Sequence, residues 1–238
     1  MLEKTKALVL RSIKYSESSL ITTFYTELFG LKTYLLRGVQ KSKKGSLRPA
    51  YFQPLMQLHI AINPHKKGSL YSLKEASVAH YYQTIYTDVK KNTIVLFLSE
   101  VLGQVIKEET PDLELFEYLE NAFLWFDHHE GIANFHLLFL INLTKFLGFY
   151  PSLVAQDHPY FDLLEGKFTS QLSNYTLANQ ELALFKKLLS VGFNELQLIK
   201  LDVIARRALL QILMTYYQLH IEGFTNPRSI KVLSALFS

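Results

Sequence analysis

LITTFYTELFGLKTYLLRG, residues 20–38, contains two short runs of β-branched, aromatic and leucine residues. Such runs favour strands, and Phe29-Gly30 supplies a turn signal between Leu20–Thr26 and Leu31–Arg37. In the second run, the side chains at 32 and 34 face one way and those at 31, 33 and 35 face the other. The stretch therefore predicts two successive β-strands.

The first 75 residues carry five runs of this kind, with turn residues between them. We predict strands at Lys4–Leu10, Leu20–Thr26, Leu31–Arg37, Leu55–Ile62 and Ser69–Glu75. Five short strands are too few for a sandwich but suit a five-stranded barrel of the OB type, a fold known for binding nucleic acid strands. The predicted fold class is α+β, with an N-terminal five-stranded OB-fold β-barrel and an all-helical C-terminal domain.

Beyond residue 79 the apolar residues follow a helical period. Helices are predicted from Ile94 to Ile106, after Pro111, over Ile132–Leu147, and at 180–189, 202–221 and 229–236. The helix over Ile132–Leu147 is apolar almost all round, so we expect it at the centre of its domain. The predicted domains are 1–78, a basic nucleic-acid-binding OB-fold, and 79–238, a helical domain with a loop or hairpin insertion at about 150–176.

The charge is distributed unevenly along the chain. Residues 1–75 hold 13 Lys/Arg and 4 Asp/Glu, a net charge of +9, whereas residues 76–238 carry a net charge of −5. A basic front half suggests that this half meets a polyanion. The chain has no cysteine, which excludes disulfides and thiolate-ligated metals. No segment reads as an export signal or membrane span, so we expect a soluble protein that is not exported from the cytoplasm.

Signals for catalysis are weak throughout the chain. His65, His80 and His158 have no partner at ligand spacing along the sequence, and His128-His129 would point in different directions on a helix. The acidic group at 108–117 lies near a helix start, where carboxylates are favoured without any catalytic role. The glycines at 38 and 45 lack the ending of a phosphate-binding loop, and there is no nucleophile elbow. We therefore predict a protein that is not an enzyme and has no catalytic residue, metal or cofactor.

The basic residues of the first domain are the strongest functional signal. A positive groove with interleaved aromatic residues suits sequence-tolerant binding of single strands, because cations contact phosphates and aromatic rings stack on bases. The predicted DNA-binding residues are Arg11, Lys14, Lys32, Arg37, Lys41, Lys43, Lys44, Arg48, Lys66 and Lys67, with Tyr15 and Tyr34 available for stacking. A solvated loop is the alternative interpretation of the lysine run at 41–44.

In order and spacing, several segments resemble RecO proteins. They are Ala7-Leu8-Val9-Leu10-Arg11, Tyr15-Ser16-Glu17-Ser18, Phe24–Gly30, Arg37-Gly38, Leu73-Lys74-Glu75-Ala76, Pro111–Phe116, Leu147-Gly148-Phe149 and Arg228–Leu233. The resemblance implies an N-terminal OB-fold, a helical C-terminal domain and a role in recombinational DNA repair after DNA damage. It implies a recombination mediator that binds and anneals single-stranded DNA. With RecR, such a mediator helps load the recombinase, an indirect partner, onto strands coated by single-strand-binding protein (SSB).

Many relatives of this kind carry a four-cysteine zinc site after the central helix, where this chain has residues 150–176 and no cysteine. We expect that region to be held instead by packing of Phe161, Leu163, Leu164 and Phe168. The resemblance also implies a site for the acidic, apolar-ended tail of SSB. Such a tail needs an apolar pocket and cations for its carboxylates. The predicted partner-binding residues are Arg206, Arg207, Arg228 and Lys231.

An alternative function belongs to a different class. The acidic helical half is also compatible with a non-catalytic protein–protein scaffold whose OB-fold is a docking module. Strand binding and annealing distinguish the two, because a pure scaffold would do neither.

Overall fold

The computed structural model describes residues 2–39, 47–62, 73–130 and 133–236. The chain divides into two compact units, Met1–His128 and His129–Ser238. The predicted domain boundary between residues 78 and 79 lies within the first unit, because two helices pack with the sheet there. The assignment of 1–78 as an independent OB-fold domain stays a prediction.

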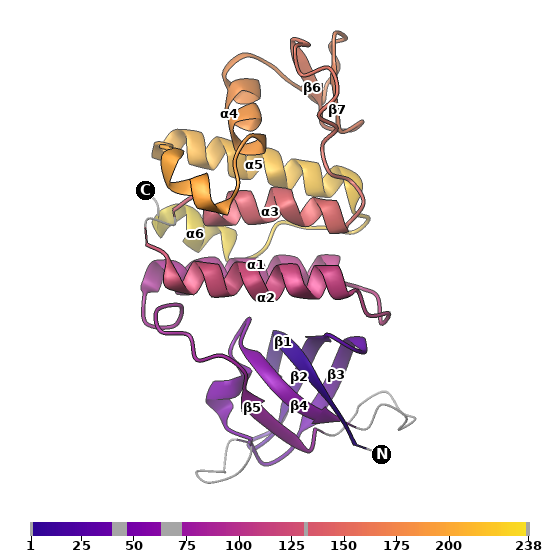
Figure 1. Cartoon of the computed structure of the whole chain (residues 1–238), viewed down its shortest axis with the longest axis vertical. Coiled ribbons are helices and arrows are strands. Elements are labelled where there is room, and N and C mark those ends of the chain that lie inside the picture. Colours follow the sequence, from indigo (N-terminus) through magenta and orange to yellow (C-terminus); the bar gives the residue numbers. More distant parts are fainter. Residues whose placement is uncertain (1, 40–46, 63–72, 131–132, 237–238) are drawn as a thin grey trace. The chain divides into compact units, whose positions relative to one another are not determined.

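In the first unit, five strands form one antiparallel sheet in the order β3-β2-β1-β4-β5 (Figure 1). Their bounds are β1 (Glu3–Lys14), β2 (Leu20–Thr26), β3 (Gly30–Leu36), β4 (Gln57–Ile62) and β5 (Glu75–Val78). β1 pairs with both β2 and β4, and its register against β2 shifts between Val9 and Arg11. An irregularity of this kind bends and twists a strand, which allows β1 to join the two halves of a curled sheet.

All five strands contribute side chains to a single core. Val9, Phe24, Tyr34, Ile60 and Ala76, one from each strand, are buried in it. A core that draws on every strand needs a sheet that curls around it, so the predicted α+β fold with an OB-like N-terminal sheet is confirmed. Of the predicted strand Ser69–Glu75, residues 69–72 lie outside the described residues, and the prediction of its end was wrong, since β5 runs from Glu75 to Val78.

Helices α1 (Val89–Val105) and α2 (Leu113–His128) complete the first unit. The Tyr25 ring, on the outer face of β2, lies 6.1 Å from the Phe116 ring of α2, and its hydroxyl donates to the Asp112 carbonyl at 3.2 Å. Gln57 of β4 donates its side-chain amide to the Glu120 carbonyl at 2.9 Å. Burial of the Tyr25 hydroxyl raises its pKa to about 12, so this contact persists as a neutral hydrogen bond over the physiological pH range.

Gly30 begins β3 in a position that only glycine fits. Its φ of +61° lies in the left-handed region, and a Cβ placed there would come within 2.4 Å of the Glu109 carbonyl oxygen. The same segment adds a backbone bond to the sheet, since the Leu31 amide donates to the Glu108 carbonyl at 3.2 Å. The chain before α2 is thereby fixed against the edge strand β3.

A buried polar network fixes the chain between β5 and α1 to the end of α2. The Asp127 carboxylate accepts the backbone N–H groups of Gln83, Thr84 and Ile85 at 2.9–3.1 Å. The Lys91 ammonium donates to the Thr84 hydroxyl and to the carbonyls of Phe126 and Asp127. Both charged residues are almost fully buried, and such charges are tolerated only when paired and hydrogen-bonded.

In the second unit, α3 (Phe135–Phe146) has 9 buried residues among its 12. This confirms the prediction of a central helix, which needs apolar residues on all sides because neighbours surround it. The other helices are α4 (Asn179–Leu189), the 3-10 helix η3 (Phe193–Leu198), α5 (Val203–His220) and α6 (Ile230–Leu236). Figure 1 shows α5 running alongside α3, and the Tyr217 hydroxyl of α5 donates to the Leu140 carbonyl of α3 at 2.8 Å.

The insertion after α3 forms a small sheet in the order β7-β6-β8, made of β6 (Tyr160–Asp162), β7 (Lys167–Thr169) and β8 (Thr176–Leu177). The predicted hairpin is therefore confirmed. The Phe161 ring lies 5.0 Å from Phe168 and 4.8 Å from Phe185 of α4. The Leu164 side chain is 47% exposed, so the prediction that it packs inward was wrong.

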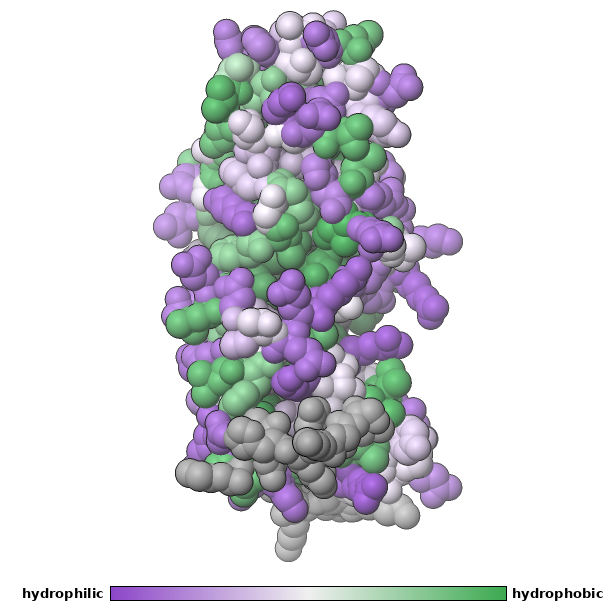
Figure 2. Space-filling view, turned by 90° about the vertical axis from the view of Figure 1, so that its right-hand side faces the viewer, coloured by the Kyte–Doolittle hydropathy of each residue, from purple (hydrophilic) through white to green (hydrophobic). Residues whose placement is uncertain are grey.

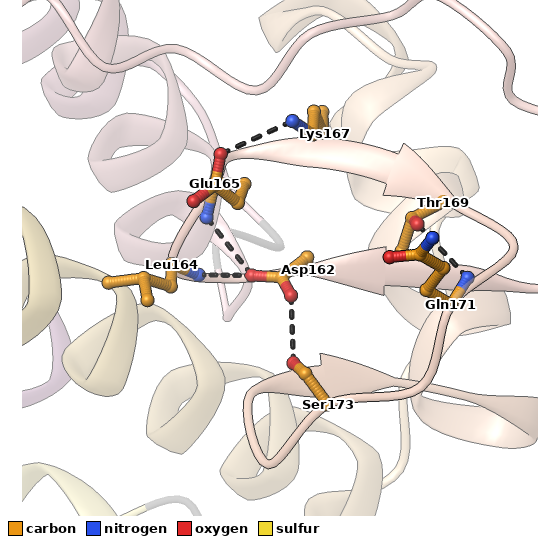
Figure 3. A network of polar contacts seen from close by, with 7 residues as sticks. All are labelled: Asp162, Leu164, Glu165, Lys167, Thr169, Gln171 and Ser173. Carbon is orange, nitrogen blue, oxygen red and sulfur yellow. Dashed lines mark hydrogen bonds and ion pairs between the residues drawn. The ribbon is translucent and has the colours of Figure 1, made fainter.

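One carboxylate organises the turns of this small sheet (Figure 3). Asp162 accepts the backbone N–H groups of Leu164 and Glu165 at 2.8 and 3.0 Å, and the Ser173 hydroxyl donates to its second oxygen at 2.7 Å. Burial would raise the pKa of Asp162, but these hydrogen bonds outweigh it and the pKa is lowered. An aromatic core and a capped turn hold this region together. Thiolates cannot bind zinc there, because the chain has no cysteine.

On the face drawn in Figure 2, hydrophilic and apolar residues are interspersed. Within the described residues, no helix combines the length and apolar character needed to cross a membrane.

Candidate nucleic-acid interface

The register of the sheet places three of the predicted DNA-binding residues at one end of β1, β2 and β3. Lys14 of β1 pairs with Leu20 of β2, which pairs with Leu36 of β3, and Arg37 directly follows Leu36. Tyr15 follows Lys14 and is 63% exposed. The structure therefore brings Lys14, Tyr15 and Arg37 to the same end of the sheet, with all three side chains in solvent.

Arg11 lies on the outer face of the same three strands. It pairs with Thr23, which pairs with Thr33, and the two threonine hydroxyls lie 3.0 Å apart. Cross-strand partners share one face of a sheet, so an exposed cation and two small polar side chains form a row across that face. Such a row offers a phosphate group one cation and two hydroxyl groups.

Two predicted residues make their contacts within the protein. Tyr34 is 1% exposed and its ring lies 5.6 Å from that of Phe24, so it packs in the barrel core and its ring is not available to a base. Lys32 donates to Glu109 at 2.8 Å, and this bond and charge lower the pKa of the Glu109 carboxyl. Alternation places Lys32 and Tyr34 on one face correctly, but that face is the inner one.

The other predicted cations of the barrel have less structural support. Arg48 is exposed at the start of the 3-10 helix η2 (Pro49–Phe52). Lys41, Lys43, Lys44, Lys66 and Lys67 lie outside the described residues. Their assignment to the interface stays a prediction.

A second basic group on the barrel was missed by sequence reasoning. Lys4, His59 and Lys74 line a hollow of about 380 Å³ on the outer face of β1, β4 and β5, together with the carboxylate of Glu75. Lys4 pairs with Ala61, which pairs with Glu75, so only the strand order brings these residues together. No spacing along the chain signals this group, because Lys4 lies in β1, His59 in β4 and Lys74 directly before β5.

Lys6 shows that a barrel lysine can also be internal to the unit. Its ammonium lies 2.9 Å from Glu120 and 3.9 Å from Glu27. The hydrogen bond to Glu120 raises the pKa of Lys6, which keeps its ammonium protonated. Lys6 therefore joins α2 to the sheet and does not belong to the candidate interface.

Of the four predicted partner-binding residues, Arg206 is bonded within the fold and the other three are exposed. Arg206 donates from Nε to the Asn134 side-chain oxygen at 3.0 Å and from a terminal nitrogen to the Leu201 carbonyl at 2.9 Å. Burial lowers its pKa. Arg207 is exposed and donates to the Ser234 carbonyl of α6 at 3.0 Å, and Arg228 and Lys231 are exposed at the start of α6. Arg206 supports the fold, whereas the other three lie on or against α6.

The acidic group at 108–117 has local structural roles. Glu109 pairs with Lys32, and the Asp112 carboxylate accepts the Leu115 N–H at 3.0 Å at the start of α2. These contacts, and the exposure of the acids, agree with the prediction that carboxylates are favoured near a helix start.

Comparison with known proteins covers the whole chain. The family model described as "Recombination protein O N terminal" matches residues 1–82, and the one described as "Recombination protein O C terminal" matches residues 86–229. DNA repair protein RecO of Flavobacterium johnsoniae is 44% identical over 235 residues, 99% of each chain. The proteins of the same name from Christiangramia forsetii and Bacteroides fragilis are 44% and 36% identical, each over 100% of both chains.

Proposed function

Because the chain belongs to the RecO family of DNA repair proteins, we propose that it is a recombination mediator that binds and anneals single-stranded DNA through its barrel. The observation that carries this proposal is the convergence of Lys14, Arg37 and the exposed Tyr15 at one end of the sheet. Cations that neutralise phosphates release counterions, which supplies sequence-independent affinity. An exposed tyrosine ring can stack on any base.

Annealing follows from contacts of this kind. Lysine and arginine side chains hold the sugar–phosphate backbone, so the base edges stay available to a complementary strand. Positive charge on the barrel also reduces the repulsion between two strands. The hollow lined by Lys4, His59 and Lys74 offers a second place for a backbone on the same barrel.

The mediator acts by binding alone, without catalysis, in the bacterial cytoplasm at the nucleoid. Its protein partners are RecR and SSB, and through them the recombinase. Arg207, Arg228 and Lys231 support a site for the acidic tail of SSB, because all three are exposed and lie on or against α6. Arg206 supports that site only indirectly, since its guanidinium is bonded to Asn134 and Leu201.

A strand-annealing assay with complementary labelled oligonucleotides tests the proposal against the scaffold alternative. The full chain should bind single strands and speed their pairing, with the effect declining as salt is raised. A chain that binds SSB or RecR but neither binds nor anneals DNA is the docking scaffold. That result would refute the mediator function while leaving family membership intact.

A further inference from the structure

We infer that His80, Asp127 and His128 form a binding site for one transition-metal ion of the zinc type. One candidate ligand atom from each residue lies within 4.8 Å of the other two, and all three residues belong to the first unit. The sequence prediction that His80 lacks a partner holds only along the chain. Folding brings it to the end of α2, and the two rings lie 5.7 Å apart.

The Asp127 carboxylate is fixed before any ion arrives. Oδ1 accepts bonds from the backbone of Thr84 and Ile85 and from the Thr84 hydroxyl, whereas Oδ2 accepts one, from the Gln83 N–H. A carboxylate oxygen has two lone pairs, so Oδ2 keeps one for a metal. Burial would raise the pKa of Asp127, but these hydrogen bonds outweigh it, and the group is ionised at neutral pH.

The His128 ring is oriented by its own helix. Its Nδ1 lies 2.7 Å from the Leu124 carbonyl oxygen, which can only accept, so Nδ1 carries the proton. Nε2 is then the nitrogen with a lone pair. Metal-binding histidines characteristically donate their other N–H to a carbonyl or carboxylate in this way.

His80 supplies the second, independent observation. Its Nε2 is buried and has no hydrogen-bond partner among the described residues. A buried polar atom without a partner is unfavourable, so its presence in a fold calls for an explanation. Coordination to an ion beside Asp127 would satisfy it.

Two imidazoles and one carboxylate select the class of ion. This donor set suits zinc, and also cobalt and nickel, more than the oxygen-preferring magnesium and calcium. Two ligands of one tetrahedral zinc ion lie about 3.4 Å apart, so a pair near the 4.8 Å limit must draw in. The exposed His128 side chain can make that movement.

The positive charge of Lys91 would lower the affinity of the site for a cation without changing the positions of the ligands. The Lys91 ammonium donates to the Asp127 carbonyl at 2.8 Å and offsets the carboxylate charge. The site would therefore carry close to the full charge of the ion, with water in the fourth position. A bound ion would have a structural effect, because it would join the chain just after β5 to the last turn of α2.

Calorimetric titration of zinc chloride into the untagged full-length protein, with cobalt absorption as a second readout, tests the site. We expect one ion per chain, and His80→Ala and His128→Ala should each weaken binding at least tenfold. His129→Ala is the matched control, since it removes the adjacent histidine outside the cluster and should leave affinity unchanged. Zinc should also raise the melting temperature of the wild-type chain but not that of His80→Ala.

Three outcomes would overturn the inference. One is the absence of saturable zinc binding by the wild-type chain. Another is binding that survives His80→Ala but is lost in His129→Ala, which would indicate a surface pair on residues 128–129. The third is unchanged affinity in both His80→Ala and His128→Ala.

Discussion

The exposed cations of the barrel differ from Arg206 of the helical unit in what their side chains contact. Lys14 and Arg37 point into solvent at one end of the sheet. Arg206 is half-buried and satisfies two oxygens within its own unit, on Asn134 and Leu201. All three side chains are cationic, but Lys14 and Arg37 are exposed, whereas Arg206 is bonded within the fold. A cation in a sequence therefore becomes a candidate contact only once its partners are known.

The largest expected effect is a loss of stability of the second unit when the Arg206 side chain is removed. Arg206→Ala leaves the Asn134 oxygen and the Leu201 carbonyl without their donor, and we expect the second unit to lose about 2–3 kcal/mol, since bonds to charged groups contribute roughly 1.5–3 kcal/mol. Hydrogen exchange of α3 and α5 amides measures this. Arg207→Ala, a neighbouring change at an exposed site, is the control and should cost under about 1 kcal/mol. Equal losses in both variants would contradict a structural role for Arg206.

The stability of the folded chain should depend on pH because of His136, whose pKa is affected by Arg206. Burial first, and then the charge of Arg206, lower the pKa of His136 to about 3 from its ordinary value of 6.5. The unfolded chain therefore binds a proton below pH 6.5 that the folded chain refuses, so stability is full above pH 6.5 and declines down to about pH 3. One proton corresponds to about 1.4 kcal/mol per pH unit, or about 2 kcal/mol between pH 6.5 and 5.

His136→Leu keeps an apolar group of similar size and removes this proton. Between pH 6.5 and 5, the stability of this variant, followed by exchange of α3 amides, should decline by about 1.4 kcal/mol less per pH unit than that of the wild-type chain. Parallel pH profiles for the two proteins would show that His136 is not held neutral.

The smallest effect is expected at Lys32, which sharpens the contrast within the barrel itself. Its ammonium is paired with Glu109, so Lys32→Ala should leave the affinity for single-stranded DNA unchanged within about twofold. Arg37→Ala, at the end of the same strand, should weaken binding. The comparison is made by fluorescence anisotropy at one salt concentration. A larger loss for Lys32→Ala than for Arg37→Ala would return Lys32 to the interface.

The sequence was sufficient to predict those features that depend on residues close to one another along the chain. Apolar period and turn residues predicted the order of strands and helices, because the pattern within one element decides which side is buried. It was insufficient for Tyr34, since alternation shows which residues share a face but not which face is inside. It also could not predict Arg206 bonding Asn134, or His80 beside Asp127, because these pairs are 72 and 47 residues apart and meet only through packing.

Most of the candidate interface depends on information of the same non-local kind. Lys14 and Arg37 were predicted individually, but the strand register brings them together. Lys4 and Lys74 were not predicted, since nothing in the sequence distinguishes them from other surface lysines. Charge distribution thus predicted the half of the chain that meets a polyanion, and the strand register shows which of its cations lie together.

We propose that exposed barrel cations contact the phosphates of single-stranded DNA. The salt dependence of binding for the double variant Lys14→Ala/Arg37→Ala measures these contacts. The control is Lys90→Ala/Lys200→Ala, which removes two exposed cations that lie outside the barrel strands. With a slope of about −0.7 per phosphate in log affinity against log salt, losing two contacts should flatten the slope by about 1.4 and weaken all sequences alike. The control should keep the wild-type slope. An unchanged slope in Lys14→Ala/Arg37→Ala, or equal flattening in both double variants, would contradict the account.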